Sequence, residues 1–151
     1  MTNKKFFTKT VISLFVLATA AAIGYFVNVE VQSYLGRQAL AKAALQNYPL
    51  DEALKKARDE NKLVLVDVAA IWCPTCRRLD KDIFADQAVK QKINERFVFS
   101  RLEYESAEGT AFLKQHDAEG FPNLWILDGD GKTVKKLRVT FDPAEFSAQL
   151  P

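Results

Sequence analysis

The chain has 151 residues, 48% of them hydrophobic and 26% charged, which suffices for one globular domain and a short extra segment but not for two domains. Its 21 basic and 19 acidic residues are mixed along the sequence and leave a formal net charge of +2. No run of lysine and arginine forms a basic stripe, so we expect no nucleic-acid partner.

The first predicted element is a long apolar helix. Three lysines within residues 1–9 precede an uncharged stretch from Thr10 to Val29, which as a helix covers about 30 Å and is long enough to cross a bilayer. We assign residues 1–9 to a cytoplasmic N-terminus and 10–29 to a transmembrane anchor or a signal segment. Small residues at 18–20 resemble a signal-cleavage site, but the sequence stays apolar beyond them, which favours the uncleaved anchor.

Both alternatives place the remainder of the chain outside the cytoplasm. Lysines precede the apolar stretch and Glu30 is the first charge after it, so the positive-inside rule predicts a cytoplasmic N-terminus. We expect a membrane-anchored protein with an exported domain, or a soluble exported protein if the segment is cleaved. Cysteines would then meet an oxidising compartment.

Residues 30–49 are rich in Ala, Gln and Leu and are predicted to form a helical spacer, interrupted by Gly36 and closed by Pro49. A domain over residues 50–151 follows. Asp51 is the predicted N-cap of its first helix, on which Leu54 and Ala57 face inward.

Both cysteines of the chain lie two residues apart, directly after the apolar run Leu63–Val68, which is typical of a strand buried on both faces. The helical pattern over 77–84, with Leu79 and Ile83 on its inner face, places Cys73 at a helix N-terminus. Helix-end N–H groups and the helix dipole favour a thiolate there. Cys76 follows about one turn later, so we predict that Cys73 is the nucleophile and Cys76 the resolving thiol.

A structural disulfide and a metal site are the alternatives for this cysteine pair. The sequence offers only Cys73, Cys76 and the single His116 as soft ligands, one fewer than a structural zinc site requires. A copper site with two thiolates and one imidazole satisfies the count, which leaves a copper metallochaperone or assembly factor as an alternative function. His116 ends a predicted helix, where histidine more often contacts terminal carbonyls. We expect no metal and no cofactor.

The remaining elements complete an α/β pattern. We predict a helix capped by Asp86, a strand over 97–102, a helix over 108–116, two strands over 123–127 and 133–139 joined by a glycine-containing turn, and a final helix opened by Asp142 and Pro143. The predicted sheet therefore mixes parallel and antiparallel pairs.

Five short motifs along this region carry a resemblance to a known family: Leu65-Val66-Asp67, Trp72-Cys73-Pro74-Thr75-Cys76, Gly120-Phe121-Pro122-Asn123-Leu124, Asp128-Gly129-Asp130-Gly131-Lys132 and Asp142-Pro143-Ala144-Glu145-Phe146-Ser147. Over about residues 50 to 150 the chain resembles the thioredoxin superfamily. Within it, the chain is most similar to the C-terminal thioredoxin-like domain of the thiol:disulfide interchange proteins (DsbD). The resemblance implies a thioredoxin fold, with a central mixed β-sheet flanked by helices and preceded here by the N-terminal hydrophobic helix.

The resemblance also implies roles for two acidic residues. Asp67 matches the family's buried acid near the sulfurs, where desolvation raises a carboxyl pKa and makes it a proton acceptor for Cys76. The alternative is an inert, hydrogen-bonded residue at the end of a strand. Asp80 matches an acidic position whose charge would disfavour the thiolates, although exposed helix acids are usually solvated.

Pro122 matches the family's cis-proline beside the dithiol, with a trans-proline at a strand start as the alternative. Trp72 and Phe121 would flank the sulfurs as an apolar contact surface for a substrate, unless they only pack in the core. Pro74 and Thr75 lie between the cysteines and are assigned to the same substrate-binding surface.

With the resemblance, these expectations combine into a membrane-tethered thiol:disulfide oxidoreductase that reduces exported proteins containing disulfides. It would lie in the bacterial inner membrane with its domain facing the periplasm, or be soluble in the periplasm if the N-terminal segment is cleaved. The single hydrophobic segment means that a separate membrane or periplasmic thiol donor must supply its electrons. Pro74-Thr75 replaces the Gly-Pro of thioredoxin, and residues between the cysteines help to set the reduction potential. A thiol oxidase or isomerase using the same residues is therefore an alternative.

Overall fold

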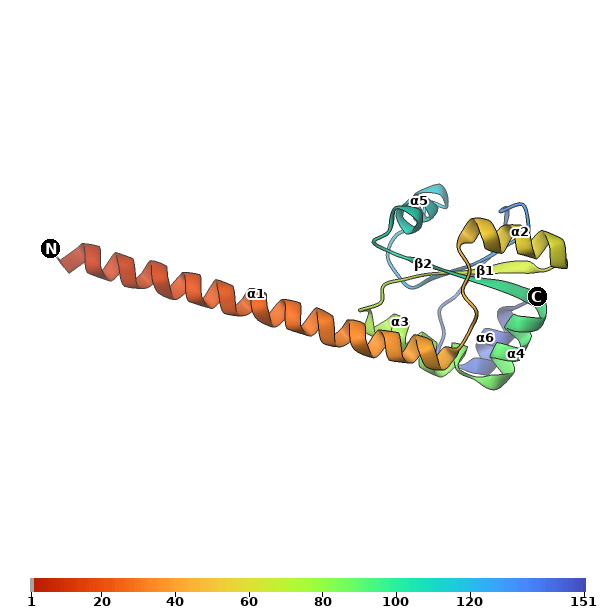
Figure 1. Cartoon of the computed structure of the whole chain (residues 1–151), viewed down its shortest axis with the longest axis horizontal. Helices are drawn as coiled ribbons and strands as arrows, with labels where there is room; N and C mark the ends of the chain where they lie inside the picture. Colours follow the sequence, from red (N-terminus) through yellow and green to blue (C-terminus); the bar gives the residue numbers. More distant parts are fainter. Residues whose placement is uncertain (1) are drawn as a thin grey trace.

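A computed structural model describes residues 2–151 of the chain, with side chains from Thr8 onward. Met1, which belongs to the N-terminal segment predicted over 1–9, lies outside the described residues. A long helix, α1 (Thr2–Ala43), leads into a layered α/β domain in which helices cover both faces of one sheet (Figure 1).

The sheet has four strands in the order β2-β1-β3-β4. Its strands are β1 (Leu63–Ala69), β2 (Phe97–Glu103), β3 (Asn123–Leu127) and β4 (Thr133–Leu137). The pair β1·β2 is parallel, whereas β1·β3 and β3·β4 are antiparallel. The predicted mixed sheet is confirmed, although β4 ends two residues before the predicted limit at Val139.

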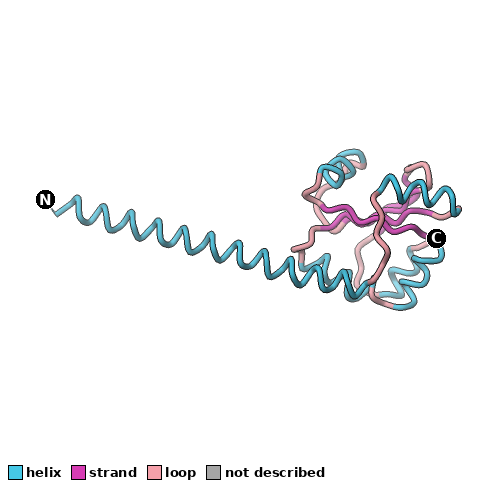
Figure 2. Tube along the Cα trace, in the orientation of Figure 1, coloured by secondary structure: helices cyan, strands magenta, loops and turns pink. Residues whose placement is uncertain are grey.

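Helices α2 (Leu50–Glu60) and α5 (Ala107–Gln115) cover one face of the sheet. The other face is covered by α3 (Pro74–Leu79), the π-helical turn η1 (Asp80–Phe84), α4 (Gln87–Arg96) and α6 (Pro143–Gln149), together with the C-terminal end of α1 (Figure 2). Each face has its own hydrophobic core. The central strand is therefore buried on both sides, as its apolar run predicts.

Side chains along β1 point alternately to the two faces of the sheet, and this alternation determines which of them lie beneath the cysteine helix. Val64, Val66 and Val68 belong to the core under α2 and α5, and Leu65 belongs to the opposite core. Because successive side chains in a strand point to opposite faces, Asp67 lies on the same side as Leu65, towards α3.

The expected helical spacer over 30–49 is only partly helical. Helix α1 continues through Gly36 and ends at Ala43, after which Ala44 adopts a left-handed φ of 51°. The next residues run along the edge of β2, where the Tyr48 N–H donates to the Phe99 carbonyl at 3.1 Å and the side chain of Asn47 accepts from the Arg101 N–H at 2.6 Å. These contacts give hydrogen-bond partners to the Phe99 carbonyl and the Arg101 N–H at the edge of β2, which a helical segment would not supply.

Two predicted helix limits also need correction. Helix α2 begins at Leu50, so Asp51 lies in its first turn rather than at the N-cap, which is Pro49. The helix after the cysteines begins at Pro74 and changes to π-helical geometry at Asp80, so it is not one regular helix over 77–84. The predicted N-caps Asp86 and Asp142 are confirmed by side-chain hydrogen bonds to Val89 and Glu145.

The N-terminal part of α1 extends away from the domain (Figure 1). Large apolar side chains are exposed along it, including Leu14, Phe15 and Phe26. By length and composition, α1 is apolar enough from Thr8 onward to cross a membrane, and none of its most apolar window is buried in the protein.

Candidate active site

The two cysteines lie where β1 gives way to α3. Cys73 is the N-cap of α3 in an extended conformation, and Pro74 occupies the first helical turn, where a missing N–H costs no hydrogen bond. The Cys73 N–H donates to the Ala70 carbonyl at 3.0 Å, and the Cys76 N–H donates to the Cys73 sulfur at 3.0 Å. The predicted position of Cys73 at a helix N-terminus is therefore observed.

The sulfurs of Cys73 and Cys76 lie 2.6 Å apart, and the Cys76 thiol donates to Cys73. Both cysteines are free. Cys73 keeps 4% of its surface exposed and Cys76 only 1%. A disulfide of about 2.05 Å can thus close with little backbone movement, and Cys73 is the sulfur that a substrate can approach first.

Burial raises the pKa of the Cys76 thiol. The hydrogen bond to Cys73 and the negative charges of Cys73 and Asp67 act in the same direction, while a backbone hydrogen bond at Ala70 opposes them. Cys76 therefore needs a proton acceptor before it can act as a nucleophile.

Asp67 is fully buried, and neither of its carboxylate oxygens has a hydrogen-bond partner among the described residues. Burial raises its pKa to about 6; the guanidinium of Arg101 opposes this shift, and the charges of Asp80 and Glu103 add to it. A carboxylate with this pKa exchanges its proton close to neutral pH, which suits a proton acceptor. Its role towards Cys76 stays a prediction.

Arg101 joins the two acidic residues that the sequence singled out. Its Nε lies 3.4 Å from Asp67 Oδ2, and its Nη1 donates to Asp80 Oδ1 at 2.7 Å. The side chain of Arg101 is only 7% exposed. Parallel pairing of β1 with β2 sets Asp67 directly opposite Arg101, so the register of the sheet creates this contact.

Asp80 is buried and forms an ion pair with Arg101, whereas acidic residues on helices are usually exposed to solvent. Burial raises its pKa, and the charge and hydrogen bond of Arg101 oppose the shift. The π-helical turn begins at Asp80, whose carbonyl accepts from the Ala85 N–H at 2.9 Å. π-Helical turns are frequent at functional sites, and this one lies directly after the cysteine helix.

Aromatic side chains surround the sulfurs. The rings of Trp72 and Phe121 meet edge to face with centroids 5.3 Å apart, and Tyr104 lies 4.5 Å from Phe121. These three half-buried side chains contact the small core that contains both cysteines. The indole N–H of Trp72 donates to Glu105 at 3.3 Å, which fixes the ring at the protein surface.

The bond between Phe121 and Pro122 is cis, as predicted. Gly120 has a φ of 72°, which favours glycine, and the Asn123 side chain donates to the carbonyls of Glu119 and Gly120. Pro74 and Thr75 are exposed at the start of α3. Substrate-binding roles for Pro122, Phe121, Pro74 and Thr75 stay predictions.

Sequence reasoning missed four residues of this site: Arg101, Glu103, Tyr104 and Glu105. The Glu103 carboxylate accepts from the Ile71 N–H at 3.1 Å and so holds the turn before the cysteines. A signal for Arg101 was present, because a cation within the apolar strand over 97–102 requires a buried anion. The other three come after the predicted limit of that strand, and nothing in the local sequence pattern marks them as part of the site.

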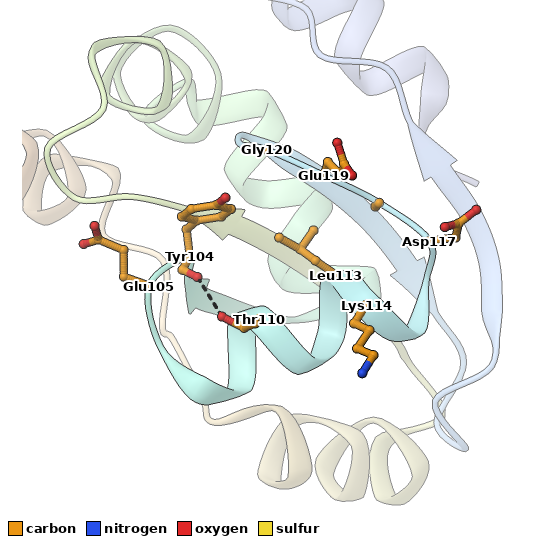
Figure 3. Close-up of a pocket in the computed structure, with 9 residues that line it drawn as sticks. Tyr104, Glu105, Thr110, Leu113, Lys114, Asp117, Glu119 and Gly120 are labelled. Carbon is orange, nitrogen blue, oxygen red and sulfur yellow. Dashed lines mark hydrogen bonds between the residues drawn. The ribbon is translucent and has the colours of Figure 1, made fainter.

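A pocket of 640 Å³ adjoins the aromatic group, with Tyr104 contributing to both. Figure 3 shows Tyr104 and Leu113 with Glu105, Lys114, Asp117 and Glu119 around them, and the Thr110 hydroxyl donating to the Tyr104 carbonyl. Three of its lining residues are acidic, Glu105, Asp117 and Glu119, and Lys114 is basic.

His116 does not join the cysteines. Its ring packs against Phe112 and Trp125, and its Nδ1 lies 3.1 Å from the Thr133 hydroxyl. Within residues 2–151, no group of three His, Cys, Asp or Glu side chains is placed to hold a metal ion. The copper site that the ligand count allowed is therefore not formed by these residues.

We expect Asp67→Asn to stabilise the protein at neutral pH. The folded pKa of about 6 exceeds the ordinary value of 3.8, so the folded state holds this proton more tightly, and wild-type stability from this group rises as the pH falls from 7 towards 4. The variant loses that dependence and gains roughly 3 kcal/mol over wild type at pH 8, but nothing near pH 4.

Thermal unfolding of both proteins between pH 4 and 8 measures this difference. The same variant should release a mixed disulfide about 100-fold more slowly, because asparagine cannot accept the Cys76 proton. If the stability difference between Asp67→Asn and wild type were the same at pH 8 as at pH 4, the assignment of the raised pKa to Asp67 would be wrong.

Comparison with known proteins adds family evidence to this geometry. The family described as "Thioredoxin-like domain" matches residues 50–151. The thiol:disulfide interchange protein DsbD of Actinobacillus pleuropneumoniae is 33% identical over 87 residues, which are 57% of this chain and 15% of that protein. The matches to DsbD proteins span between 15% and 18% of their length.

Two solved structures illustrate the shared fold. A putative disulphide-isomerase from Bacteroides thetaiotaomicron superposes with a TM-score of 0.62 at 32% identity, covering 70% of this chain and 88% of the other. The oxidised C-terminal domain of Neisseria meningitidis DsbD has a TM-score of 0.57 at 20% identity, covering 69% and 96%, and shows the shared fold.

Proposed function

This chain belongs to the thioredoxin-like family of thiol:disulfide oxidoreductases through residues 50–151, and from that premise we propose that it is a membrane-tethered periplasmic enzyme that reduces protein disulfides. The observation that carries the proposal is the pair of free sulfurs 2.6 Å apart, with Cys73 as the N-cap of α3. Helix-end N–H groups aimed at a sulfur favour its anion.

The proposed reaction proceeds in two exchanges. The Cys73 thiolate attacks one sulfur of a substrate disulfide, forming a mixed disulfide and releasing the other substrate sulfur as a thiolate. Cys76 then transfers its proton to Asp67 and attacks the Cys73 sulfur, which releases the second substrate thiolate. Two electrons pass to the substrate, and Cys73 and Cys76 end as a disulfide.

The surroundings of the dithiol favour the reducing direction. Strong thiol oxidants owe their high potential to a stabilised reduced form. Here burial raises the pKa of Cys76, and two carboxylates share one guanidinium beneath the sulfurs, leaving a net negative charge when both are ionised. Both features disfavour thiolates and so favour release of electrons.

The apolar half of α1 supports the membrane tether. It is long enough to span a bilayer, and its large apolar side chains are exposed. With lysines before it, the domain would face the periplasm. Its substrates would be exported proteins with disulfides, and a membrane or periplasmic thiol donor would restore the dithiol.

A thiol oxidase or isomerase remains the alternative function, since the same two sulfurs run the exchange in either direction. Trp72, Phe121, Pro74, Thr75 and Pro122 would form the substrate-binding surface in all of these cases. The equilibrium constant with glutathione separates the directions.

We expect the full chain, purified from washed membranes in detergent, to retain its complete N-terminus by mass and to have a reduction potential below about −200 mV. Equilibration with glutathione at pH 7, followed by quantification of the two redox forms, gives this value. A potential near −120 mV would assign the protein to the oxidases. A mature chain lacking its first 20 or so residues and found in the soluble fraction would exclude the anchor.

A further inference from the structure

The C-terminal end of α1 packs against the elements that carry the cysteines. It contacts α3 and η1, and Ser33, Ala39 and Ala43 on this face are buried. Small side chains allow the two helices to approach closely. The segment lies outside the family match, which begins at residue 50.

Gly36 makes the closest approach. A Cβ atom built at Gly36 would lie 1.9 Å from the carbonyl oxygen of Ile71 and 3.1 Å from its carbonyl carbon, so no side chain fits there without displacing one backbone from the other. Ile71 is part of the turn that leads directly into Trp72 and Cys73.

Gln32 contacts the other end of the cysteine motif. Its Oε1 accepts a hydrogen bond of 2.5 Å from the guanidinium of Arg77, the residue after Cys76. The Arg77 N–H in turn donates to the Cys73 carbonyl at 3.0 Å, in the first turn of α3. One face of α1 thus contacts the chain both before Cys73 and after Cys76.

We propose that Gln32 and Gly36 are positioning residues for the dithiol. Through them, α1 holds the loop at Ile71 and the first turn of α3 in fixed positions relative to each other. The functional unit therefore begins in α1 rather than at residue 50. The proposal rests on the proposed function. Glu103 holds the N–H side of Ile71 and Gly36 lies against its carbonyl side, so the turn is fixed from two elements.

The same contact fixes the distance of the dithiol from the membrane. About 10 Å of helix axis separate Val29, the end of the uncharged stretch, from Gly36. Since α1 is one continuous helix to Ala43, the domain is held close to the bilayer surface without a flexible linker, and the partner that exchanges electrons with it must reach the dithiol there.

Gly36→Leu tests the proposal, and Gly24→Leu is its matched control. Both glycines lie in α1, but a Cβ at Gly24 meets nothing within 4 Å. In Gly36→Leu the Ile71 turn must move, which weakens the N–H donation to the Cys73 sulfur and disfavours the reduced form. We expect the equilibrium with glutathione to move about tenfold towards the protein disulfide in Gly36→Leu, and to stay at the wild-type value in Gly24→Leu.

Gln32→Ala is the milder test, with Gln38→Ala as control, because the exposed Gln38 side chain donates to the Tyr34 hydroxyl on α1 itself. Gln32→Ala keeps the helix packing intact, so it reports on positioning even if Gly36→Leu does not fold. The full chain in detergent is used throughout, and the rate of Cys73 alkylation is followed against pH. We expect alkylation at neutral pH to slow about threefold in Gln32→Ala alone.

Wild-type equilibrium and alkylation profiles in a folded Gln32→Ala would overturn the positioning role, as would an unchanged equilibrium in a folded Gly36→Leu. A wild-type protein that does not exchange with glutathione at all would instead refute the proposed function, so the two failures are distinguishable.

Discussion

Cys73→Ser should abolish disulfide reduction, lowering turnover by on the order of 10³-fold or more, because the serine hydroxyl is a far weaker nucleophile than a thiolate. Cys73 is the N-cap of α3 and receives N–H and S–H donors from Cys76. Serine is also a good N-cap, so the fold should survive. Insulin reduction with a dithiol as electron source, together with circular dichroism, measures both effects.

Cys76→Ala is the matched control for this prediction. It also loses turnover, but Cys73 can still attack, so the variant should accumulate a covalent mixed disulfide with its substrate that mass spectrometry detects. Cys73→Ser should form no such adduct through Cys76, which is 1% exposed. Adducts on Cys76 rather than Cys73 would reverse the assigned roles.

Arg101→Gln should lower the free energy of unfolding at pH 7 by about 3–5 kcal/mol, because removal of one member of a buried ion pair leaves its partners uncompensated. Arg101 is the counter-charge for both Asp67 and Asp80, whose side chains are 0% and 2% exposed. Chemical denaturation of the full chain in detergent, followed by tryptophan fluorescence, measures the loss.

Two further experiments separate the effect of the Arg101 charge from the effect of its packing. Adding Asp80→Asn to Arg101→Gln should recover part of the lost stability, because the pair between Arg101 and Asp80 is then replaced rather than broken, while Asp67 still lacks its counter-charge. The loss in Arg101→Gln should also shrink as the pH falls from 7 to 4, since burial raises the carboxyl pKa values of Asp67 and Asp80 and so favours uptake of a proton by each. An equal loss at both pH values would mean that packing of the Arg101 stem, not its charge, is responsible.

The ion triad also bears on the chemistry. Two carboxylates and one guanidinium beneath the thiols hold a residual negative charge that opposes thiolate formation, while the helix N-terminus at Cys73 favours it. The reduction potential reflects the balance of these opposing effects. The register of the sheet brings the charged triad together, and the start of α3 at Cys73 supplies the opposing effect.

Local patterns in the sequence were sufficient for most of the fold. The apolar run over 63–68, the N-caps Asp86 and Asp142, and the turn before β4 each depend on neighbouring residues, and each is observed. The position of Cys73 at a helix start followed from the helical pattern after it, and the cis bond before Pro122 followed from the resemblance to the thioredoxin superfamily. Asp67 was predicted to be buried, and it is.

What the sequence determined by itself was therefore the order of the elements, the cysteine pair and the acid on the strand before it, because backbone preferences and side-chain periodicity act over a few residues. Only the tertiary structure decided that Arg101 pairs with both acids and that Gly36 and Gln32 contact the cysteine turn. Those contacts join residues tens of positions apart, and they exist only once strand register and helix packing have brought the backbones together.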